Sequence, residues 1–531
     1  MSEPITIKRG VELELDIKSL AYGGMGVAKI NNFVIFVKGA IPGEKIIARI
    51  YKKRKGYAEG TVKEVVEKSN YAEKIRCNHY YVCSKVQSLS YDQQIIEKAN
   101  QVEDAFHRLG GFSEFSLHGK IKAEQTYNYR NKMEFTFSPH RWVLEDEPEG
   151  VDKSFALGLH MTGRYDKILD INNCHLQPEI GNHILSLARE VCLQNPQLRP
   201  YDPKTHIGFL RFLMLRFGVN TNDLMVNIVT SYNDINKLSP LIDTLLKEFP
   251  EITSMVNNVN TRKADVAFGE YETLLYGEPF IREKLGKLTF EISANSFFQT
   301  NTKQGEVLYN EVSKLIGLTG EEIVYDLYCG TGTIGLFIAE KAKKVYGFEV
   351  IRSALDDAEK NADLNNIENI QFLKANLDTF FKSGQLPNRI PKPDVIIVDP
   401  PRAGMHPDMA QYLPKLKAKK IIYVSCNPTT QARDAKILCE KGYWFWVIGT
   451  ITKLGFFISL ILILFQRNYS FIYNVAVYLA VLFLITVLVT IDAPRMRSIF
   501  EPLVYLVIGH GLNYFYVFLT RYKNKIKKNN Y

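Results

Sequence analysis

Three short polar segments carry the residues best suited to chemistry, and each follows an apolar run. Cys426 follows "IIYV", Asp399 follows "VIIV", and a glycine turn that begins at Gly330 follows "EEIVYDL". Such apolar runs are typical of buried strands in α/β sheets, and these sheets bind ligands beyond the carboxyl ends of their strands. The order of these segments predicts a thiol, a carboxylate and a glycine turn at the ligand-binding edge of one sheet.

The glycine turn predicts a site for a nucleotide-type cofactor. Gly330, Gly332 and Gly335 let the backbone approach a ligand closely, and Glu349 ends the next predicted strand, where it can accept hydrogen bonds from a ribose. An aromatic residue and a cysteine precede the first glycine, so "DLYCGTGTIG" departs from a dinucleotide fingerprint. The loop instead resembles the turn of S-adenosylmethionine (SAM) methyltransferases, in which Cys329 would be a small packed residue.

Asp399 opens the segment "DPPRAG", in which Pro400 and Pro401 stiffen the turn and fix the direction of the carboxylate. The segment is either a structural turn or a ligand-facing loop. In a SAM enzyme, an Asp-Pro-Pro loop commonly faces the base that is methylated, which favours a nucleic-acid target. An adenine amino methyltransferase is an alternative for this loop, but that activity has no use for Cys426.

Cys426 is either an inert cysteine or a nucleophile, and the other two segments favour the nucleophile. Carbon 5 of uracil is too weakly nucleophilic to take a methyl group directly. A thiolate that adds to carbon 6 creates an enolate whose electron density lies on carbon 5, and this carbon can attack a sulfonium methyl group. A general base must then remove the carbon-5 proton so that the thiol is expelled.

Five motifs together resemble the RNA uracil-5 methyltransferase family, with similarity from about residue 5 to residue 443. In chain order they are "YRNKMEF", "ISANSFFQTN", "DLYCGTGTIGL", "VDPPRAG" and "YVSCNPTTQARD". The resemblance implies SAM as cofactor, RNA as partner and Cys426 as catalytic nucleophile. The residues that it places around SAM and the target base are Gln299, Tyr328, Glu349 and Asp399, with further contact positions at Thr333 and Asn376. The target base must leave its stack, so Phe297 and Phe298 are candidates to hold it, with core packing as the alternative.

Several domains are needed to position these residues, and 531 residues of which 46% are hydrophobic provide ample core. We expect an OB-like β-barrel over residues 1–69 and an α+β region over 70–290. A doubly wound α/β SAM-methyltransferase domain that lacks its last strands is expected over 291–443. Hydrophobic, transmembrane-like helices follow over 444–531.

The first segment resembles a TRAM domain, an RNA-binding barrel. Its basic cluster, Lys52 to Lys55, is then a set of phosphate contacts, with a solvated hairpin tip as the alternative. The net charge of +9 permits a polyanionic partner without demanding one. 23S ribosomal RNA is the favoured substrate because TRAM-bearing members with cysteine clusters commonly act there, and transfer RNA is the alternative.

Two departures from the family pattern affect the chemistry. Many members hold a four-iron, four-sulfur cluster with four cysteines, but only Cys77, Cys83 and Cys174 have counterparts here, and "CSKV" replaces the expected Cys-Gly-Gly-Cys. Three thiolates need an outside ligand, so an intact iron–sulfur cluster is not expected and no metal is assigned. A degenerate cluster, or zinc assisted by His79 or His175, is the alternative.

The second departure concerns the general base. Family members continue past "KGY" to a Pro-x-Thr-x-His-x-Glu stretch whose glutamate resembles the base that takes the carbon-5 proton. Nothing after Tyr443 resembles this stretch, and Glu501 lies between two hydrophobic segments. We therefore expect addition and methyl transfer without efficient release of the adduct. An RNA-binding protein without turnover is the alternative from a different class.

The tail changes character after Tyr443. Phe471–Ile491 carries no charge and has the roughly 20-residue length of a membrane span, and its neighbours give two or three expected transmembrane helices over 444–531. Three spans would place the basic end of the chain outside, against the positive-inside rule. The sequence favours a cytoplasmic methyltransferase part fused to the end of a membrane protein. A membrane-tethered enzyme is the alternative.

Overall fold

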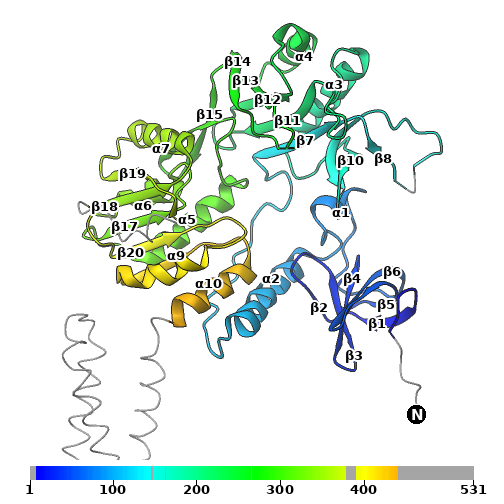
Figure 1. The fold of residues 1–531 in the computed structure, drawn as a ribbon, viewed down its shortest axis with the longest axis horizontal. Coiled ribbons are helices and arrows are strands. Elements are labelled where there is room, and N and C mark those ends of the chain that lie inside the picture. The colour runs from blue at the N-terminus through cyan, green and yellow to red at the C-terminus, as the bar shows by residue number, and fades with distance from the viewer. Residues whose placement is uncertain (1–6, 145–146, 162, 265, 378–389, 441–531) are drawn as a thin grey trace, which may run out of the picture. The chain divides into compact units, whose positions relative to one another are not determined.

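The computed structural model describes residues 7–144, 147–161, 163–264, 266–377 and 390–440 (Figure 1). The described residues up to Leu438 form one compact unit. The transmembrane helices expected over 444–531 lie outside the described residues. Within the described ranges, no helix is both long enough and apolar enough to cross a bilayer.

A six-stranded β-sheet curls around one core at the start of the chain. Its strands are β1 (Glu12–Asp16), β2 (Ser19–Leu20), β3 (Gly26–Ile30), β4 (Phe33–Lys38), β5 (Lys45–Lys53) and β6 (Tyr57–Glu67), in the order β1-β5-β6-β4-β3-β2. The pairing of β4 with β6 is parallel, which brings two strands that are not consecutive together. Alternate residues such as Ile46, Ala48 and Ile50 of β5 are buried in this core, as period-two patterning predicts.

Three helical segments follow the first sheet: α1 (Tyr80–Cys83), α2 (Tyr91–Ala105) and the π-helical turn η1 (Phe106–Gly110). The turn ends at Gly111, which adopts a left-handed conformation with φ of 73°. Glycine takes that conformation without the penalty that a side chain would bring, so the helix stops there.

The middle of the chain is an eight-stranded sheet in the order β14-β13-β12-β11-β7-β9-β10-β8. Helices α3 (Glu179–Gln194) and α4 (Ile235–Glu248) bury their apolar stripes against it. Its strands are β7 (Lys132–Ser138), β8 (Arg141–Trp142), β9 (Ala156–Met161), β10 (Arg164–Asp170), β11 (Leu210–Phe217), β12 (Leu224–Thr230), β13 (Ser254–Val259) and β14 (Tyr271–Gly277). A separate hairpin of β15 (Phe280–Leu285) and β16 (Leu288–Ser293) follows. The division expected at residue 290 falls within β16, and the domain limits remain predictions.

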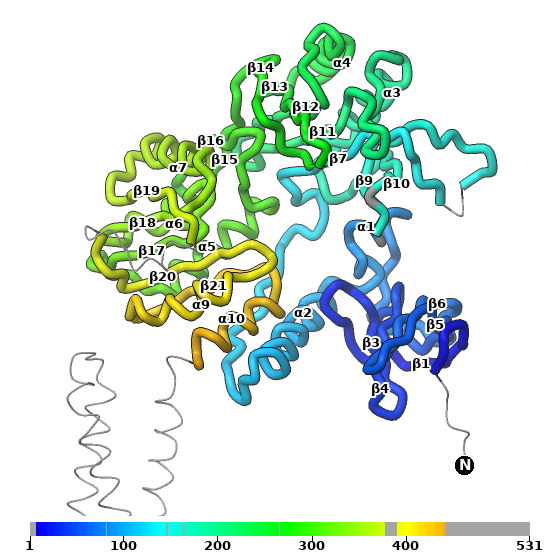
Figure 2. Tube along the Cα trace, in the orientation of Figure 1, coloured from blue at the N-terminus to red at the C-terminus, as the bar shows by residue number. Residues whose placement is uncertain are grey.

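Five parallel strands form the last sheet, in the order β19-β18-β17-β20-β21. They are β17 (Ile323–Leu327), β18 (Lys344–Glu349), β19 (Ile370–Lys374), β20 (Val395–Val398) and β21 (Lys420–Tyr423). The helical segments of this region are α5 (Thr302–Ile316), α6 (Thr333–Ala339), α7 (Arg352–Leu364), α9 (Pro407–Tyr412), η2 (Leu413–Leu416) and α10 (Pro428–Glu440). Figure 2 shows β17, β18 and β20 side by side.

Helices cover both faces of this sheet, because its strands are apolar on both sides. Val324 of β17 packs in a core that includes side chains of α5, α6 and α7, whereas its neighbour Tyr325 packs in a second core with α9 and η2. The predicted doubly wound α/β fold is confirmed in this part of the chain. The strand order reverses between β17 and β20, and ligands of such sheets bind at that switch point.

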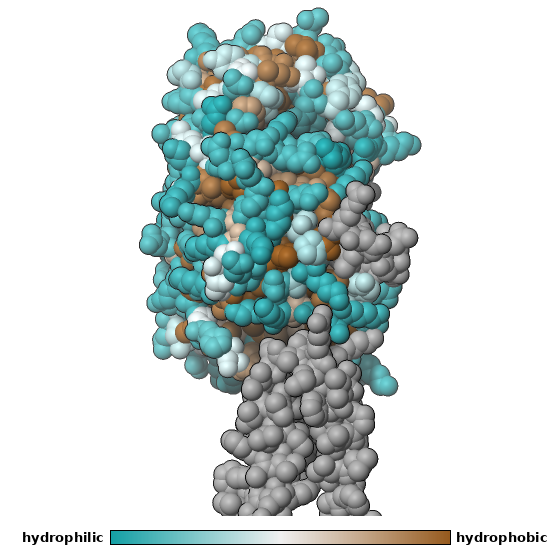
Figure 3. Space-filling model, turned by 90° about the vertical axis from the view of Figure 1, so that its left-hand side faces the viewer, coloured by the Kyte–Doolittle hydropathy of each residue, from teal (hydrophilic) through white to brown (hydrophobic). Residues whose placement is uncertain are grey.

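Hydrophilic residues predominate on the face of the described residues that Figure 3 shows, and small hydrophobic areas lie among them. Scattered exposed apolar residues are normal for a globular protein. The chemically informative surface is therefore the carboxyl edge of the parallel sheet.

Candidate active site

The glycine turn begins where β17 ends. Tyr328 takes a left-handed conformation with φ of 62°, which is uncommon for an aromatic residue, and Gly330 and Gly332 follow with φ of 55° and 74°. A Cβ atom on Gly332 would lie 2.7 Å from the ring of Phe372. Only glycine fits at position 332 without displacing that ring, and the backbone of the turn is left open to a ligand.

Glu349, at the end of β18, is held beside this turn by backbone amides. Its Oε2 accepts a hydrogen bond from the Gly330 N–H at 3.2 Å, and its Oε1 accepts from Val350 and Ile351 at 2.7 and 3.0 Å. These contacts fix the carboxylate next to the glycines, and the ribose-binding role of Glu349 stays a prediction. Asn376 lies exposed shortly after the end of β19, the strand that pairs with β18 in parallel.

Two further carboxyl groups lie near the turn, of which Asp326 is buried and Asp399 is half-buried. Burial raises the pKa of Asp326 to about 7, with the neighbouring Asp399 and Glu349 carboxylates adding to the rise, while its Oδ2 accepts from Gly335 N–H at 2.9 Å. Burial likewise raises the pKa of Asp399 to about 6. Three acidic groups therefore gather at one edge of the sheet, where they favour a ligand with a positive charge.

Cys329 is buried in this turn, and its burial raises the pKa of the thiol well above the usual range. Its prediction as a packed residue is confirmed. Cys426, in contrast, is an exposed free thiol in the segment between β21 and α10. Asn427 caps the helix that follows, since its Oδ1 accepts from Thr429 N–H at 3.1 Å. Backbone N–H groups at the start of a helix favour anions.

The Asp399 and Cys426 segments are joined by several hydrogen bonds. Val424 N–H donates to the Val398 carbonyl at 2.9 Å, and Asn427 Nδ2 donates to the Arg402 carbonyl at 3.1 Å. Because β20 and β21 are parallel neighbours, their carboxyl ends present both segments at the same edge. The structure thus brings together the two loops on which the sequence interpretation depended.

Arg433 and Asp434 connect the Asp399 and Cys426 segments through hydrogen bonds, although sequence reasoning assigned these two residues no function. Asp434 is fully buried, and its Oδ2 accepts from Met405 N–H and from the Tyr423 hydroxyl, both at 2.7 Å. Arg433 donates to the carbonyls of Ala403 and Met405 at 3.0 and 3.1 Å. The available signal was the charged pair at the end of "TTQARD", which follows Cys426 closely in sequence and lies within α10.

Gln299 lies in the segment before α5, and its backbone carbonyl accepts from Asn131 Nδ2 at 2.8 Å. It also lines a cavity of about 320 Å³ beside α5. Thr333 is buried at the start of α6, and its hydroxyl is within 3.1 Å of the Tyr309 hydroxyl, so it has a partner inside the protein. The motifs "YRNKMEF" and "ISANSFFQTN" therefore meet through Asn131.

The two phenylalanines of "ISANSFFQTN" differ in exposure. Phe298 is 4% exposed and packs against Phe290 with ring centroids 5.8 Å apart, so it belongs to the core. Phe297 is 65% exposed, and its carbonyl accepts from the Thr331 hydroxyl in the glycine turn at 3.2 Å. Of the pair, Phe297 alone offers a free ring close to the candidate cofactor site.

The cysteines with counterparts in the cluster pattern, Cys77, Cys83 and Cys174, are all free. Burial raises the pKa of the Cys174 thiol, whereas Cys83 is exposed. Burial, together with His175, lowers the pKa of His79 to about 4. These groups lie near one another, yet in the described ranges no set of three or more His, Cys, Asp or Glu side chains has the geometry to hold a metal ion.

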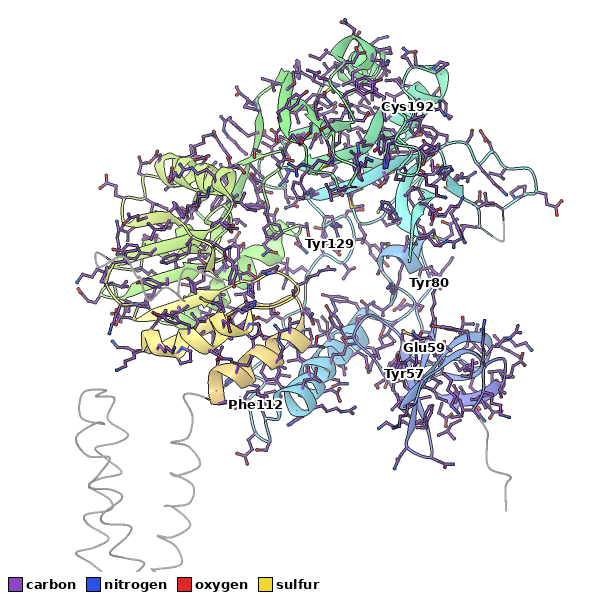
Figure 4. All side chains as sticks on the ribbon, in the orientation of Figure 1. Tyr57, Glu59, Tyr80, Phe112, Tyr129 and Cys192 are labelled. Carbon is purple, nitrogen blue, oxygen red and sulfur yellow. The ribbon has the colours of Figure 1, made fainter. Side chains whose placement is uncertain are left out.

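The basic cluster lies at the tip of the β5–β6 hairpin. Lys52 forms an ion pair with Glu59, Nζ to Oε1 2.5 Å, and the Tyr51 hydroxyl donates to the same carboxylate at 3.1 Å. Figure 4 labels Glu59 on β6 close to Tyr57. Lys53, Arg54 and Lys55 are exposed, so these three cations remain available to a polyanion.

Comparisons with known proteins agree with this geometry. Sequence models match the tRNA (uracil-5-)-methyltransferase family over residues 271–441 and the TRAM domain over residues 7–63. An uncharacterized RNA methyltransferase of Chlorobaculum tepidum is 40% identical over 458 residues, covering 83% of this chain and 93% of the relative. One of Porphyromonas gingivalis is 38% identical, covering 81% and 94%.

A solved structure is also similar. The tRNA (uracil-54, C5)-methyltransferase of Pyrococcus abyssi, in complex with S-adenosyl-L-homocysteine, superposes with a TM-score of 0.61 at 28% sequence identity. The match covers 80% of this chain and 93% of that one.

Proposed function

The chain belongs to the RNA uracil-5 methyltransferases, which use SAM, and on that premise we propose that it methylates carbon 5 of a uridine through a covalent adduct with Cys426. The observation that carries the proposal is the junction of the Asp399 and Cys426 loops at the carboxyl edge of the parallel sheet. An exposed thiol at this edge is explained by attack on a base.

The described residues suit the steps of this reaction. Cys426 adds to carbon 6 of the uracil, and the electron pair moves to carbon 5. SAM supplies the methyl group, and its sulfonium charge matches the acidic edge formed by Asp326, Glu349 and Asp399. Glu349 binds the ribose of the cofactor, while Asp399 faces the target base. Gln299, Tyr328 and Asn376 complete the cofactor and base contacts, and Thr333 supports them through Tyr309.

Phe297 stacks on the flipped nucleotide or on its neighbour, because its ring is the exposed one of the aromatic pair. Lys53, Arg54 and Lys55 contact phosphates outside the catalytic site. Release of the product needs a base that removes the carbon-5 proton, after which the electron pair expels the Cys426 thiolate. No glutamate of the expected Pro-x-Thr-x-His-x-Glu type occurs in the sequence after Tyr443, so we propose that this step is slow.

We propose 23S ribosomal RNA as the substrate and transfer RNA as the second candidate. The TRAM domain at residues 7–63 supports 23S ribosomal RNA, for the reason given in the sequence analysis. The second is supported by the Pyrococcus abyssi enzyme, whose name specifies uridine 54 of tRNA. Methylation of unmodified transcripts of both RNAs, with SAM labelled in its methyl group, decides between them.

The nucleophile is tested with RNA that contains 5-fluorouridine, because fluorine at carbon 5 blocks proton removal and traps the adduct. We expect wild-type protein and a Cys439→Ala control to form a SAM-dependent covalent complex that carries one methyl group. Cys426→Ala should form none, and mass spectrometry should locate the linkage at Cys426. An adduct in Cys426→Ala disproves the nucleophile assignment, and RNA binding with no adduct in the wild type supports the binding-protein alternative.

A further inference from the structure

A tyrosine of the N-terminal domain touches the backbone of the candidate nucleophile. The Tyr22 hydroxyl donates a hydrogen bond to the Cys426 carbonyl oxygen at 3.3 Å, although 404 residues separate the two in sequence. Tyr22 is 50% exposed, so its ring stands at the surface next to an exposed thiol. An aromatic ring in such a place is open to the substrate.

The turn that carries Tyr22 is rigid. It joins β2 to β3 and is closed by hydrogen bonds from Ala21 N–H to the Met25 carbonyl at 2.8 Å and from Gly24 N–H to the Ala21 carbonyl at 3.0 Å. Gly23 and Gly24 have φ of 95° and 84°, a region that glycine alone enters freely. The turn therefore presents Tyr22 in a defined direction.

Side chains of helix α2 form hydrogen bonds with the backbone beside this turn. Glu97 is 3% exposed and accepts a hydrogen bond from Leu20 N–H at 2.8 Å. One turn later, Gln101 Nε2 donates to the carbonyls of Leu20 and Ala21 at 3.2 and 3.4 Å. A buried carboxylate with a backbone partner is costly to separate from that partner, so β2 and α2 hold together.

The far end of the same helical segment approaches α10. A Cβ atom on Gly110 of η1 would lie 3.4 Å from the Ala432 carbonyl oxygen and within 2.5 Å of the ring of Phe112, which Figure 4 labels. Ala432 belongs to the helix that follows Cys426, and it is fully buried. The segment from α2 to η1 thus contacts both the Tyr22 turn and the helix behind the nucleophile.

We propose that Tyr22 is a positioning residue of the active site, supplied by the N-terminal domain. Its hydroxyl fixes the peptide group of Cys426, and its ring stacks on the nucleotide beside the target uridine. This inference rests on the proposed function. It gives the N-terminal domain a part in the reaction beyond binding of RNA phosphates.

Two variants separate the two contributions. Tyr22→Phe keeps the ring and removes the hydrogen bond, so the rate of adduct formation with 5-fluorouridine RNA should fall about fivefold with an unchanged KM for RNA. Tyr22→Ala also removes the ring, so KM should rise about tenfold in addition. Tyr71 is a tyrosine of the same region that is 47% exposed, and the control variant Tyr71→Phe should behave as wild type.

A second measurement needs neither RNA nor SAM. The rate at which iodoacetamide alkylates Cys426, followed by mass spectrometry of its peptide, should rise severalfold in Tyr22→Phe because the loop is released, and should stay unchanged in Tyr71→Phe. Equal alkylation and equal adduct rates in Tyr22→Phe and wild type overturn the proposal. If the alkylation rate changes in Tyr22→Phe but the wild type forms no adduct, the contact between Tyr22 and Cys426 is supported and the proposed function is disproved.

Discussion

Acidic side chains at the end of the parallel strands prepare the site for a cationic ligand before any ligand is bound. Glu349 receives three backbone N–H bonds, whereas Asp326 keeps Oδ1 without a hydrogen-bond partner among the described residues. The two carboxylates therefore differ in role. Glu349 is oriented for contact, whereas ionisation of the buried Asp326 carboxyl group is unfavourable unless a nearby positive charge stabilises it.

Asp326 should make stability depend on pH in a predictable direction. Its pKa is raised to about 7 in the folded chain, so the folded state binds a proton more tightly than the unfolded state. The contribution of Asp326 to the free energy of unfolding should be greatest below about pH 4 and should fall by roughly 2 to 4 kcal/mol as pH rises to about 7. Urea titrations of wild type and Asp326→Asn across this pH range should show the fall as the difference between the two proteins. An unchanged slope in Asp326→Asn contradicts the assignment.

Glu349 should contribute to affinity for the cofactor rather than for RNA. Glu349→Gln keeps the shape of the side chain but removes the charge, so the Kd for SAM should rise about tenfold. Calorimetry measures this change, and Glu359→Gln, on the exposed part of α7, is the matched control. Binding of RNA should not change. A Kd within twofold of wild type would show that Glu349 does not contact the cofactor.

Sequence reasoning predicted the residues at strand ends better than it predicted their neighbours. Cys426, Asp399 and Glu349 follow apolar runs, and parallel strands bring such positions to one edge. The pattern does not show that Phe298 is buried and Phe297 exposed, since both stand in the same run. Nor does it reveal Tyr22, because contact across 404 residues leaves no local signal.

Elements around the site are joined by side chains that come from one helix. Asp434 of α10 bonds to the segment after β20 and to Tyr423 of β21, so the helix locks the two catalytic loops in one arrangement. The apolar runs predicted these strands, whereas the helix α10 that follows Cys426, with proline as its first residue, comes from the structure. The lock itself was not predicted, because a charged residue in a helix is usually exposed.

Removing the charge of Asp434 should loosen the two loops together. Asp434→Asn weakens the hydrogen bonds to Met405 and Tyr423 and leaves Arg433 without its ion pair, so the free energy of unfolding should fall by about 1 to 3 kcal/mol. The rate of adduct formation should fall as well. Thermal melts and 5-fluorouridine trapping measure the two effects, with Asp363→Asn on exposed α7 as control. Equal loss in both variants rules out a special role for Asp434.

At the scale of the molecule, the proposed RNA contacts are divided between the basic tip of the β5–β6 hairpin and the surface at the Cys426 thiol. Lys53, Arg54 and Lys55 lie on a hairpin of the first domain, and Tyr22 lies on another turn of that domain. The cations of the hairpin bind through charge, whereas Tyr22 binds through its aromatic ring. Removal of the cations and removal of Tyr22 should therefore affect the salt dependence of RNA binding differently.

Replacing Lys53, Arg54 and Lys55 with alanine should weaken RNA binding with a reduced salt dependence. Each lost phosphate contact lowers the slope of log K against log salt concentration by about 0.7 to 0.9, so the triple variant should lose roughly 2 units. Filter binding between 50 and 200 mM salt, about the range in which such contacts dominate, measures the slope. Lys247→Ala on α4 is the control. An unchanged slope supports the solvated hairpin tip.

Turnover on ordinary RNA should stop after one cycle. The proposed mechanism needs a base for the carbon-5 proton, and no stretch of the expected type occurs after Tyr443. Labelled methyl transfer should show a burst of about one equivalent per protein, with the RNA retained on Cys426. Rapid-quench kinetics distinguishes this from steady turnover. Sustained turnover in which the adduct with Cys426 does not accumulate would mean that another group removes the proton.

The bond between Tyr22 and Cys426 joins an early part of the nascent chain to a late one. The ribosome adds about 5 to 20 residues per second, so the 404 intervening residues take roughly 20 to 80 seconds to emerge. During that time the first domain folds while its partner does not yet exist. The hydrogen bond from Tyr22 to Cys426 can therefore form only after residue 426 has been made, and a nascent chain stalled before that residue lacks both the thiol and this contact.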